Sequence, residues 1–264
     1  MAELSTSRLK SDWDRIGQSL PPFIDAPSTR YYFECEQLLL NRYFPTLKRK
    51  RLLKTDLWDE AKNSQILFWA AEQGADVTGI DISPAITAEA RALWGWAKKE
   101  GARALFVISD LRMLAFTDNS FDLVYSMGTV EHFPEYRQAI RECYRVLKKD
   151  GLAIIGVPNK QDLFLRPLLV SFLNLLNLYF YGPEKSFSPK ALERMMEEAG
   201  FQVVAMSGLL FIPGWLRMLD LYIYIRWPKA SFLIRPFIRP FAFLFHKFPS
   251  LRRHGYLIAC VGRK

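Results

Sequence analysis

Cysteine is scarce in this chain of 264 residues, and its scarcity removes one kind of site from consideration. The three cysteines, Cys35, Cys143 and Cys260, lie far apart, so none belongs to a Cys-x-x-Cys pair that would hold zinc. An odd and sparse set is typical of a reducing compartment. We therefore expect buried free thiols and no metal site.

Few features of the sequence favour a segment that directs a protein into or across a membrane. Residues 1–6 contain no basic stretch followed by an apolar one, so we expect no cleaved signal peptide. The most apolar stretch, residues 163–181, is interrupted by Arg166, Pro167 and two asparagines, and it barely reaches the roughly 20 residues that a spanning helix needs. We expect a buried or interfacial helix there. The expected location is cytoplasmic, either free or peripheral at the inner face of a membrane.

Acidic residues are too few to balance the basic ones. The chain has 36 Lys and Arg against 27 Asp and Glu, which gives a formal net charge of +9. Such a charge favours contact with polyanions: nucleic acid, anionic lipid surfaces or phosphorylated substrates. Half of the residues are hydrophobic, which excludes a disordered chain and is enough for the core of one α/β domain with insertions.

Apolar segments alternate with helical patterns from residue 51 onward. We expect strands at residues 51–56, 77–81, 105–110, 121–126, 152–157, 201–206 and 256–261. We expect helices between them at residues 63–73, 84–100, 135–148 and 188–200. The first five strands are continuous apolar runs, as required of strands that are covered on both faces.

This alternation predicts an α/β fold, a doubly wound, Rossmann-like and mostly parallel sheet with helical cap insertions. Residues 1–50 are expected to form an N-terminal helical cap. Residues 51–264 are expected to form the main domain, with insertions at about 160–187 and 208–254.

Three acids fall at the expected ends of the first three strands: Asp56, Asp81 and Asp110. In doubly wound folds, ligands bind beyond the carboxyl ends of the strands. An acid after the second strand can accept hydrogen bonds from both hydroxyls of a ribose, and one after the third can accept from an adenine amine. Their order predicts a nucleoside-containing ligand at this edge.

Several segments resemble the class I S-adenosylmethionine-dependent methyltransferases. The resemblance rests on residues 77–83 (Val-Thr-Gly-Ile-Asp-Ile-Ser), on 110–111, on 121–133 and on 145–151 before an apolar strand, and it covers roughly residues 50–206 plus the last strand. It implies S-adenosylmethionine as the cofactor. It also implies the residues that bind it: Asp81 and Ile82 at the ribose, Asp110 and Leu111 at the adenine, and Ser126, Met127 and Gly128 along the methionine moiety.

The loop after the first strand departs from the family's pattern, which is an acid followed by glycines at alternate positions. Residues 54–63 contain no glycine, which also argues against nicotinamide and flavin dinucleotides. Asp56 keeps an acidic position, whereas Trp58, Asp59 and Glu60 stand where side chains could crowd the methionine end. Either Asp56, Asp59 or Glu60 contacts the ammonium or sulfonium, or the site has decayed. In the second case the chain is a catalytically inactive module that binds a membrane or a partner protein.

Two residues after the fourth strand are the catalytic candidates. Methyl transfer from a sulfonium is an in-line displacement that depends mainly on alignment, and a base helps only when the acceptor is a hydroxyl or an acidic carbon. His132 is the candidate for that base or for positioning the acceptor, with Glu131 beside it. A structural role for this histidine is the competing interpretation.

The insertion at 208–254 mixes aromatic and aliphatic residues with bases, and its only acid is Asp220. This pattern suits an interfacial element on anionic lipid. Nucleic-acid binding and a plain helical cap are the alternatives, but the wealth of Leu, Ile and Phe favours a lipid or a lipophilic acceptor.

We therefore expect a methyltransferase that acts on a hydrophobic small-molecule or lipid-like acceptor, with possible peripheral membrane contact through 208–254. The inactive module and an RNA methyltransferase stay as alternatives, although nucleic acid is the less favoured partner, and the oligomeric state is open.

Overall fold

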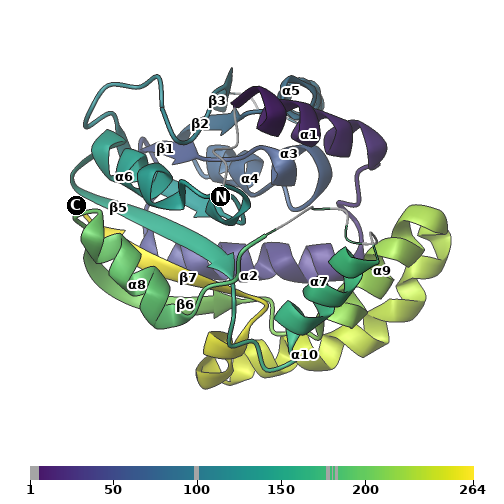
Figure 1. Cartoon of the computed structure of the whole chain (residues 1–264). Helices are drawn as coiled ribbons and strands as arrows, with labels where there is room; N and C mark the ends of the chain where they lie inside the picture. The colour runs from purple at the N-terminus through teal and green to yellow at the C-terminus, as the bar shows by residue number, and fades with distance from the viewer. Residues whose placement is uncertain (1–5, 98–100, 177–178, 180, 182–183) are drawn as a thin grey trace.

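Seven strands form one sheet with helices on both faces in the computed structural model, which describes residues 6–97, 101–176, 179, 181 and 184–264 (Figure 1). The strand order is β3-β2-β1-β4-β5-β7-β6. Strands β1 to β5 pair in parallel, and β7 runs antiparallel to both of its neighbours. The predicted α/β, doubly wound and mostly parallel fold is confirmed. The strands are β1 (Arg51–Lys54), β2 (Asp76–Asp81), β3 (Arg103–Ile108), β4 (Phe121–Met127), β5 (Leu147–Pro158), β6 (Gln202–Leu209) and β7 (Leu257–Arg263).

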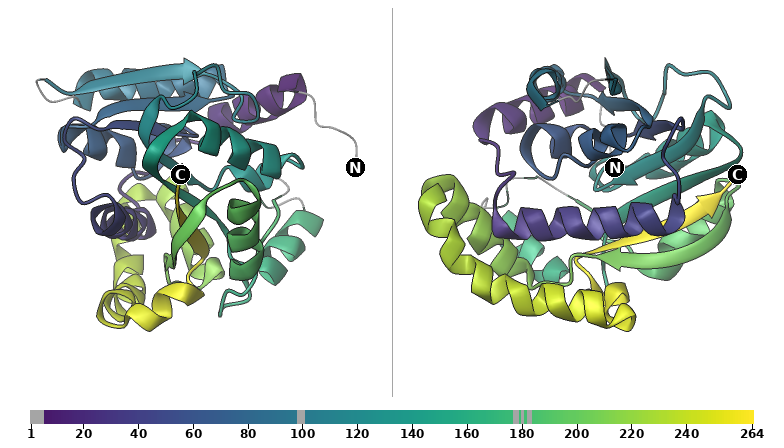
Figure 2. Two further views of the ribbon diagram at one scale, coloured as in Figure 1. Left: turned by 90° about the vertical axis from the view of Figure 1, so that its left-hand side faces the viewer. Right: turned by 180° about the vertical axis from the view of Figure 1, so that it is seen from behind.

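Neighbouring residues of the central strands pack on opposite faces of the sheet, because side chains alternate along a strand. Leu52 and Leu123 join the core under α2 (Pro27–Tyr43), α4 (Ile66–Glu72) and α5 (Pro84–Ala97). Leu53 and Val124 join the core under α6 (Tyr136–Val146) and α8 (Pro189–Glu198). Figure 2 shows α2 along one side of the sheet. Burial on both faces explains why the strands are continuous apolar runs.

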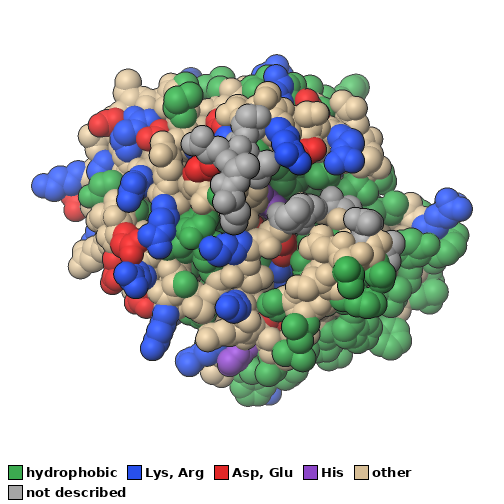
Figure 3. Space-filling model, viewed as in Figure 1, with side chains coloured by type: hydrophobic (Ala, Val, Ile, Leu, Met, Phe, Trp, Pro, Cys, Tyr) green, Lys and Arg blue, Asp and Glu red, His purple; other side chains and the backbone are tan. Residues whose placement is uncertain are grey.

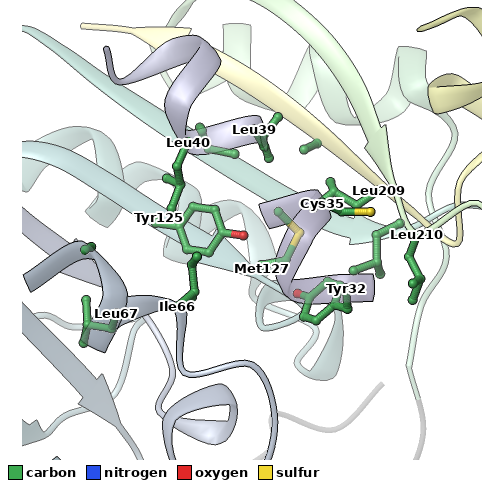
Figure 4. Close-up of a cluster of buried hydrophobic side chains, with 14 of the residues drawn as sticks. Tyr32, Cys35, Leu39, Leu40, Ile66, Leu67, Tyr125, Met127, Leu209 and Leu210 are labelled. Atoms are coloured by element: carbon green, nitrogen blue, oxygen red, sulfur yellow. The ribbon is translucent and has the colours of Figure 1, made fainter. Parts of the chain in front are cut away.

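Helix α2 covers the sheet near its centre (Figure 4). Tyr32 and Leu39 of α2 pack with Tyr125 and Met127 of β4, and Leu209 closes the cluster from the end of β6. The N-terminal segment therefore supplies part of the main core as well as a cover.

The late insertions form a group of helices at one end of the molecule, which we call the helical lobe. It comprises α7 (Arg166–Leu175), α9 (Gly214–Arg226), the 3-10 helix η2 (Pro228–Ile234), α10 (Arg235–Lys247) and the 3-10 helix η3 (Pro249–His254). Helix α9 contacts both α7 and α2, and α10 also lies against α2 (Figure 1). Among the described residues, no helix has the length and apolar character needed to cross a membrane.

Several predicted boundaries were wrong, and the first of these errors lies at the first loop. Strand β1 ends at Lys54 and not at Asp56, and a five-residue helix, α3 (Trp58–Lys62), occupies the loop. The next helix then starts at Ile66, three residues later than predicted, after Gln65 adopts a left-handed conformation with φ of 60°. The predicted end of the helix near residue 100 lies outside the described residues.

The other boundary errors reflect strand pairing that the apolar pattern does not reveal. Strand β5 begins at Leu147, because this residue pairs with Phe121 of β4. Strand β6 continues to Leu209, which pairs with Leu257 at the start of β7, so the second insertion starts later than residue 208. The backbone N–H of Tyr256 also donates to the carbonyl of Leu210, so the two ends of this insertion lie side by side.

Candidate active site

One pocket lies at the carboxyl ends of the strands and continues beneath the helical lobe, and its cavity measures about 150 Å³. Of the predicted site residues, all but Glu60 and Ser126 line it: Asp56, Asp59, Asp81, Ile82, Asp110, Leu111, Met127, Gly128, Glu131 and His132. The fold thus brings together residues that lie far apart in the sequence.

The acids of the first loop surround a lysine that the sequence analysis did not single out. Lys54 is fully buried, and its Nζ lies 2.9 Å from Asp56, 3.1 Å from Asp59 and 3.1 Å from Glu60. Burial alone would lower the pKa of Lys54, but the surrounding carboxylates raise it well above its ordinary value. One internal cation therefore neutralises part of the acidic cluster.

The same cluster contains more negative charge than Lys54 can balance. Burial raises the pKa of Glu60 to about 7, even though Lys54 opposes the shift. Burial also raises the pKa of Asp56. Behind them, Glu36 of α2 accepts a hydrogen bond of 2.7 Å from Tyr125, and burial raises its pKa well above the ordinary value. The cluster is therefore rich in carboxyl groups, and burial makes Glu60, Asp56 and Glu36 hold their protons more tightly than exposed carboxyls do.

The first loop avoids crowding the pocket by turning two of its side chains away. Leu57 packs against Gly79, where an added Cβ would come within 2.3 Å of it. Glu60 accepts a hydrogen bond of 2.9 Å from the backbone of Leu67 and faces Lys54. Trp58 and Asp59 remain in the pocket wall. The crowding anticipated from Trp58, Asp59 and Glu60 is thus limited to the first two.

Asp81 ends β2 and organises the loops on either side. Its two carboxylate oxygens accept hydrogen bonds from the backbone N–H groups of Leu57, at 2.9 Å, and Ser83, at 2.8 Å. Burial raises the pKa of Asp81 to about 7, although both hydrogen bonds act against the shift. Each oxygen keeps a second lone pair, and the side chain lines the pocket.

Asp110 lies two residues beyond β3 and is held by an arginine. Arg112 donates to it at 2.7 Å and also reaches Glu135 at 2.9 Å. Burial opposes the shift, but the hydrogen bonds from Arg112 and Thr6 lower the pKa of Asp110 below its ordinary value. This carboxylate is therefore ionised and fixed in orientation.

The end of β4 connects to the first loop through hydroxyl groups. Ser126 is buried, and its Oγ accepts a hydrogen bond of 2.7 Å from Thr55, so it supports the wall without lining it. Thr129 donates to Asp56 at 3.0 Å. Between them, Gly128 has a φ of 73°, and an added Cβ would meet only Glu131, at 3.7 Å. The chain therefore turns with bare backbone beside open space.

Glu131 and His132 form a second polar group with Glu184. A ring nitrogen of His132 and one carboxylate oxygen from each glutamate all lie within 4.8 Å of one another. Burial, with the Glu184 carboxylate adding to it, raises the pKa of Glu131 well above its ordinary value. The His132 ring packs edge-on against Trp13, with centroids 4.9 Å apart. The described part of the pocket thus contains a carboxyl with a raised pKa beside an imidazole.

Helix α1 (Thr6–Ser19) contributes to the wall of the pocket. Leu9 and Trp13 line the cavity. Asp14 accepts hydrogen bonds from the hydroxyl of Ser83, at 2.5 Å, and from the backbone of Ala85, at 3.0 Å. The cavity, at about 150 Å³, is smaller than the roughly 300–1,000 Å³ of typical ligand sites.

Sequence reasoning missed the far wall of the pocket. That wall contains two arginines, a carboxylate and four tyrosines: Arg166, Arg217, Glu184, Tyr32, Tyr179, Tyr181 and Tyr256. Arg166 had been noted only as an interruption of an apolar stretch, and Arg217 only as one base of a basic segment. A lone charge within an apolar run was the signal that could have found Arg166.

Comparisons with known proteins agree with this geometry. The sequence model described as a methyltransferase domain matches residues 62–155. A demethylmenaquinone methyltransferase of Thermus thermophilus is 32% identical over 170 residues, which cover 58% of this chain and 75% of that protein. A 2-methyl-6-phytyl-1,4-hydroquinone methyltransferase of Synechocystis is 34% identical over 38% of this chain and 30% of that protein. A ubiquinone biosynthesis O-methyltransferase of Azoarcus is 28% identical over 54% of this chain and 62% of that protein.

Solved structures share the fold at lower sequence identity. The cyclase SpnF superimposes with a TM-score of 0.65 at 16% identity, over 100% of this chain and 97% of that one. A phosphoethanolamine N-methyltransferase of Haemonchus contortus, solved with S-adenosylhomocysteine, gives a TM-score of 0.62 at 17% identity, over 99% of this chain and 60% of that one. These structural likenesses show only the fold. The evidence for methyltransferase activity comes from the sequence relatives.

Proposed function

Because this chain belongs to the class I S-adenosylmethionine-dependent methyltransferases, we propose that it methylates a small, largely apolar acceptor that carries a polar head. One observation carries the proposal: a single pocket joins the acids at the strand ends to a chamber beneath the helical lobe. The strand ends suit the cofactor, and the chamber suits the head of the acceptor.

The donor groups of the strand ends fit S-adenosylmethionine. Asp81 offers two carboxylate oxygens to ribose hydroxyls, and Asp110, held in place by Arg112, offers an acceptor to the adenine amine. Asp56 and Asp59 present negative charge to the ammonium and sulfonium groups. The bare backbone at Gly128 leaves room beside the methionine moiety.

We propose that His132 is the residue that acts on the acceptor. S-adenosylmethionine, when bound, would supply an electrophilic methyl group on a neutral thioether leaving group, so the protein needs no acid for the leaving group. His132 lines the pocket and takes the proton of an acceptor hydroxyl or acidic carbon, while its contact with Trp13 fixes the ring. Glu131, whose pKa burial raises well above its ordinary value, is assigned as a hydrogen-bond donor to an oxygen of the acceptor.

Two observations support an apolar acceptor. The relatives described above are named for demethylmenaquinone, for a phytyl hydroquinone and for ubiquinone biosynthesis. Large hydrophobic side chains are also exposed over the helical lobe, as Figure 3 shows at the lower right. Exposed clusters of this kind mark contact surfaces. They include Leu168, Phe172, Leu175, Trp215, Tyr222, Trp227, Phe232, Phe237 and Phe243.

We further propose that this surface rests on an anionic bilayer. The only acid of the late insertion, Asp220, is buried and accepts a hydrogen bond from Ser28, so no acid of this insertion faces outward. The exposed charges of the insertion are therefore basic: Arg226, Lys229, Arg235, Arg239, Lys247 and Arg253. Apolar groups with bases around them match an anionic membrane surface.

The methyl-transfer proposal is tested with labelled S-adenosylmethionine and two hydroquinones that share one ring, one with an isoprenoid tail and one without. We expect kcat/KM to be at least tenfold higher for the tailed acceptor. Equal rates for the two, or methylation of the tailless ring alone, would contradict an apolar acceptor. Calorimetry with S-adenosylhomocysteine on the same preparation establishes that the cofactor site is intact.

Membrane contact is tested by sedimentation with vesicles of phosphatidylglycerol and phosphatidylcholine, and with phosphatidylcholine alone. Each base near the surface contributes about 1 kcal/mol, so the pair Arg235→Gln and Arg239→Gln should weaken binding to the anionic vesicles about 30-fold. The pair Phe232→Ser and Phe237→Ser should weaken binding to both kinds of vesicle. A wild-type protein that stays in the supernatant at every composition would overturn the proposal.

A further inference from the structure

Arg166 is a fully buried arginine with unused donors in the pocket wall. Its side chain is 2% exposed at the first turn of α7. Its Nη2 donates to Tyr179, at 3.1 Å, and lies 2.5 Å from Glu184. The Tyr256 side chain also interacts with the guanidinium. Within the described part of the chain, the Nε and Nη1 of Arg166 have no hydrogen-bond partner of good geometry. Buried donors without an acceptor are costly and rare, so they indicate a ligand.

A second buried arginine faces the same chamber from α9. Arg217 donates to the carbonyl of Ser28 at 3.3 Å, and its guanidinium carbon lies 5.4 Å from the centre of the Tyr32 ring. Both arginines approach the ring of Tyr256, Arg166 at 4.1 Å and Arg217 at 5.9 Å. Two elements of the helical lobe therefore direct positive charge at one ring and one cavity.

The acids near this chamber have neighbouring cations. Glu184 pairs with the Arg166 guanidinium and also accepts a hydrogen bond of 2.8 Å from Tyr179. Asp59 shares Lys54 with the other acids of the first loop. The acid that interacts with Arg217 is Asp220, which is buried and does not line the pocket. On the chamber side, an incoming group would therefore meet the guanidinium of Arg217 directly.

We propose that Arg166, assisted by Arg217, binds an anionic oxygen on the head of the acceptor, the oxygen of a carboxylate or of a phenolate. This inference rests on the proposed methyl transfer and narrows its substrate class to oxyanion-bearing heads on an apolar body. Guanidinium groups are suited to such oxygens, since their hydrogen bonds to an anion are stronger than those between neutral groups. The oxyanion would then lie in the same pocket as His132, which acts on the neighbouring hydroxyl or carbon.

The test compares pairs of probes that differ only in the anionic oxygen. Calorimetry on the protein saturated with S-adenosylhomocysteine measures 4-hydroxybenzoate against 4-hydroxybenzamide, and 4-nitrophenol at pH 8 against 4-nitroanisole. We expect the acid or the phenolate to bind about 10- to 100-fold more tightly than its neutral partner, as expected for hydrogen bonds to a charged group. The carboxylate pair and the phenolate pair together identify which oxyanion is preferred.

Variants then assign the preference to the arginine. Arg166→Met should reduce the preference to about unity, and Arg166→Lys should restore part of it. Because Arg166→Met leaves Glu184 without its partner, the double variant Arg166→Met with Glu184→Gln removes both charges together. Arg194→Met, on the exposed face of α8, is the matched control and should keep the full preference.

Each result has one meaning. Equal binding of the acid and the amide by wild type, or an unchanged preference in the double variant, would overturn the inference and assign Arg166 a structural role. A wild type that does not bind S-adenosylhomocysteine would instead overturn the function proposed above. The comparison of probes on wild type needs no variant, so the proposal stays testable if a variant does not fold.

Discussion

Replacing Lys54 by methionine removes the one cation from the acidic cluster of the first loop and keeps the length of the side chain. Lys54 is 0% exposed, and its ammonium lies 2.9–3.1 Å from the carboxylates of Asp56, Asp59 and Glu60. In the variant these carboxylates face one another in a buried site.

The expected loss of stability is large. Removing one partner of a buried ion pair costs about 3–5 kcal/mol, because the remaining charge stays buried without compensation. For a chain of this size, such a loss corresponds to a melting temperature lower by roughly 6–20 °C. Total stabilities are about 5–15 kcal/mol, so the variant should fold but with a much smaller margin.

The loss should depend on pH in a defined direction. Burial already raises the pKa of Glu60 to about 7 and also raises the pKa of Asp56, and without Lys54 both pKa values rise further. Unfolded carboxyls titrate near pH 4. Since the folded pKa values exceed the unfolded ones, the folded state binds more protons, and stability falls as the pH rises from about 4 through 7. The variant should therefore be close to wild type at pH 5 and far below it at pH 8.

The assay is thermal unfolding by circular dichroism at pH 5, 6.5 and 8, with Lys190→Met on the exposed start of α8 as the control. Equal stability of Lys54→Met and wild type at pH 8 would refute the reasoning. So would a loss that is the same at all three pH values, since that would indicate lost packing and not uncompensated charge. A calorimetric corollary is that the folded variant should favour the cationic S-adenosylmethionine over neutral S-adenosylhomocysteine more strongly than wild type does.

Three further predictions concern the pocket. Asp81→Asn should weaken S-adenosylhomocysteine about 10- to 100-fold by calorimetry, and wild-type affinity should rise between pH 6 and 8, because ribose hydroxyls favour the ionised carboxylate whose pKa is about 7 before binding. A flat pH profile would contradict this. His132→Ala should lower kcat about 10²- to 10⁴-fold with S-adenosylhomocysteine affinity little changed, whereas the control His246→Ala should keep both. Trp13→Ala should speed the release of S-adenosylhomocysteine in stopped-flow measurements, because this ring closes the pocket; an unchanged rate would show that α1 does not limit exit.

The sequence predicted the sheet well because its strands are buried on both faces. Successive residues such as Leu52 and Leu53 pack on opposite faces of the sheet, and both faces are buried. Each strand therefore appears in the sequence as an unbroken apolar run. Asp81 and Asp110 were identified because parallel strands end at one edge, whatever the loops do. The resemblance to a known family then assigned them a ligand.

The details that escaped prediction depend on contacts between distant segments. Lys54 looks like an ordinary exposed end of a strand until α3 folds back and places Asp59 and Glu60 around it. In the sequence, Arg166 only interrupts an apolar helix. In the folded chain it contacts Tyr256 and Glu184, which come from other segments. Charge within an apolar context is visible in a sequence, but its partner is not.

The closed base of the late insertion has a consequence for how specificity can change. Gly208 and Gly255 face the opposite chain so closely that an added Cβ would lie 1.8 Å from the carbonyl oxygen of Arg252 and 2.2 Å from that of Leu209. Strands β6 and β7 therefore meet as the two arms of a hairpin, with α9, η2, α10 and η3 as an enlarged loop between them. A segment with adjacent ends is an exchangeable cassette: another segment grafted between the same two glycines would replace the α9 side of the pocket and leave the strand ends unaltered.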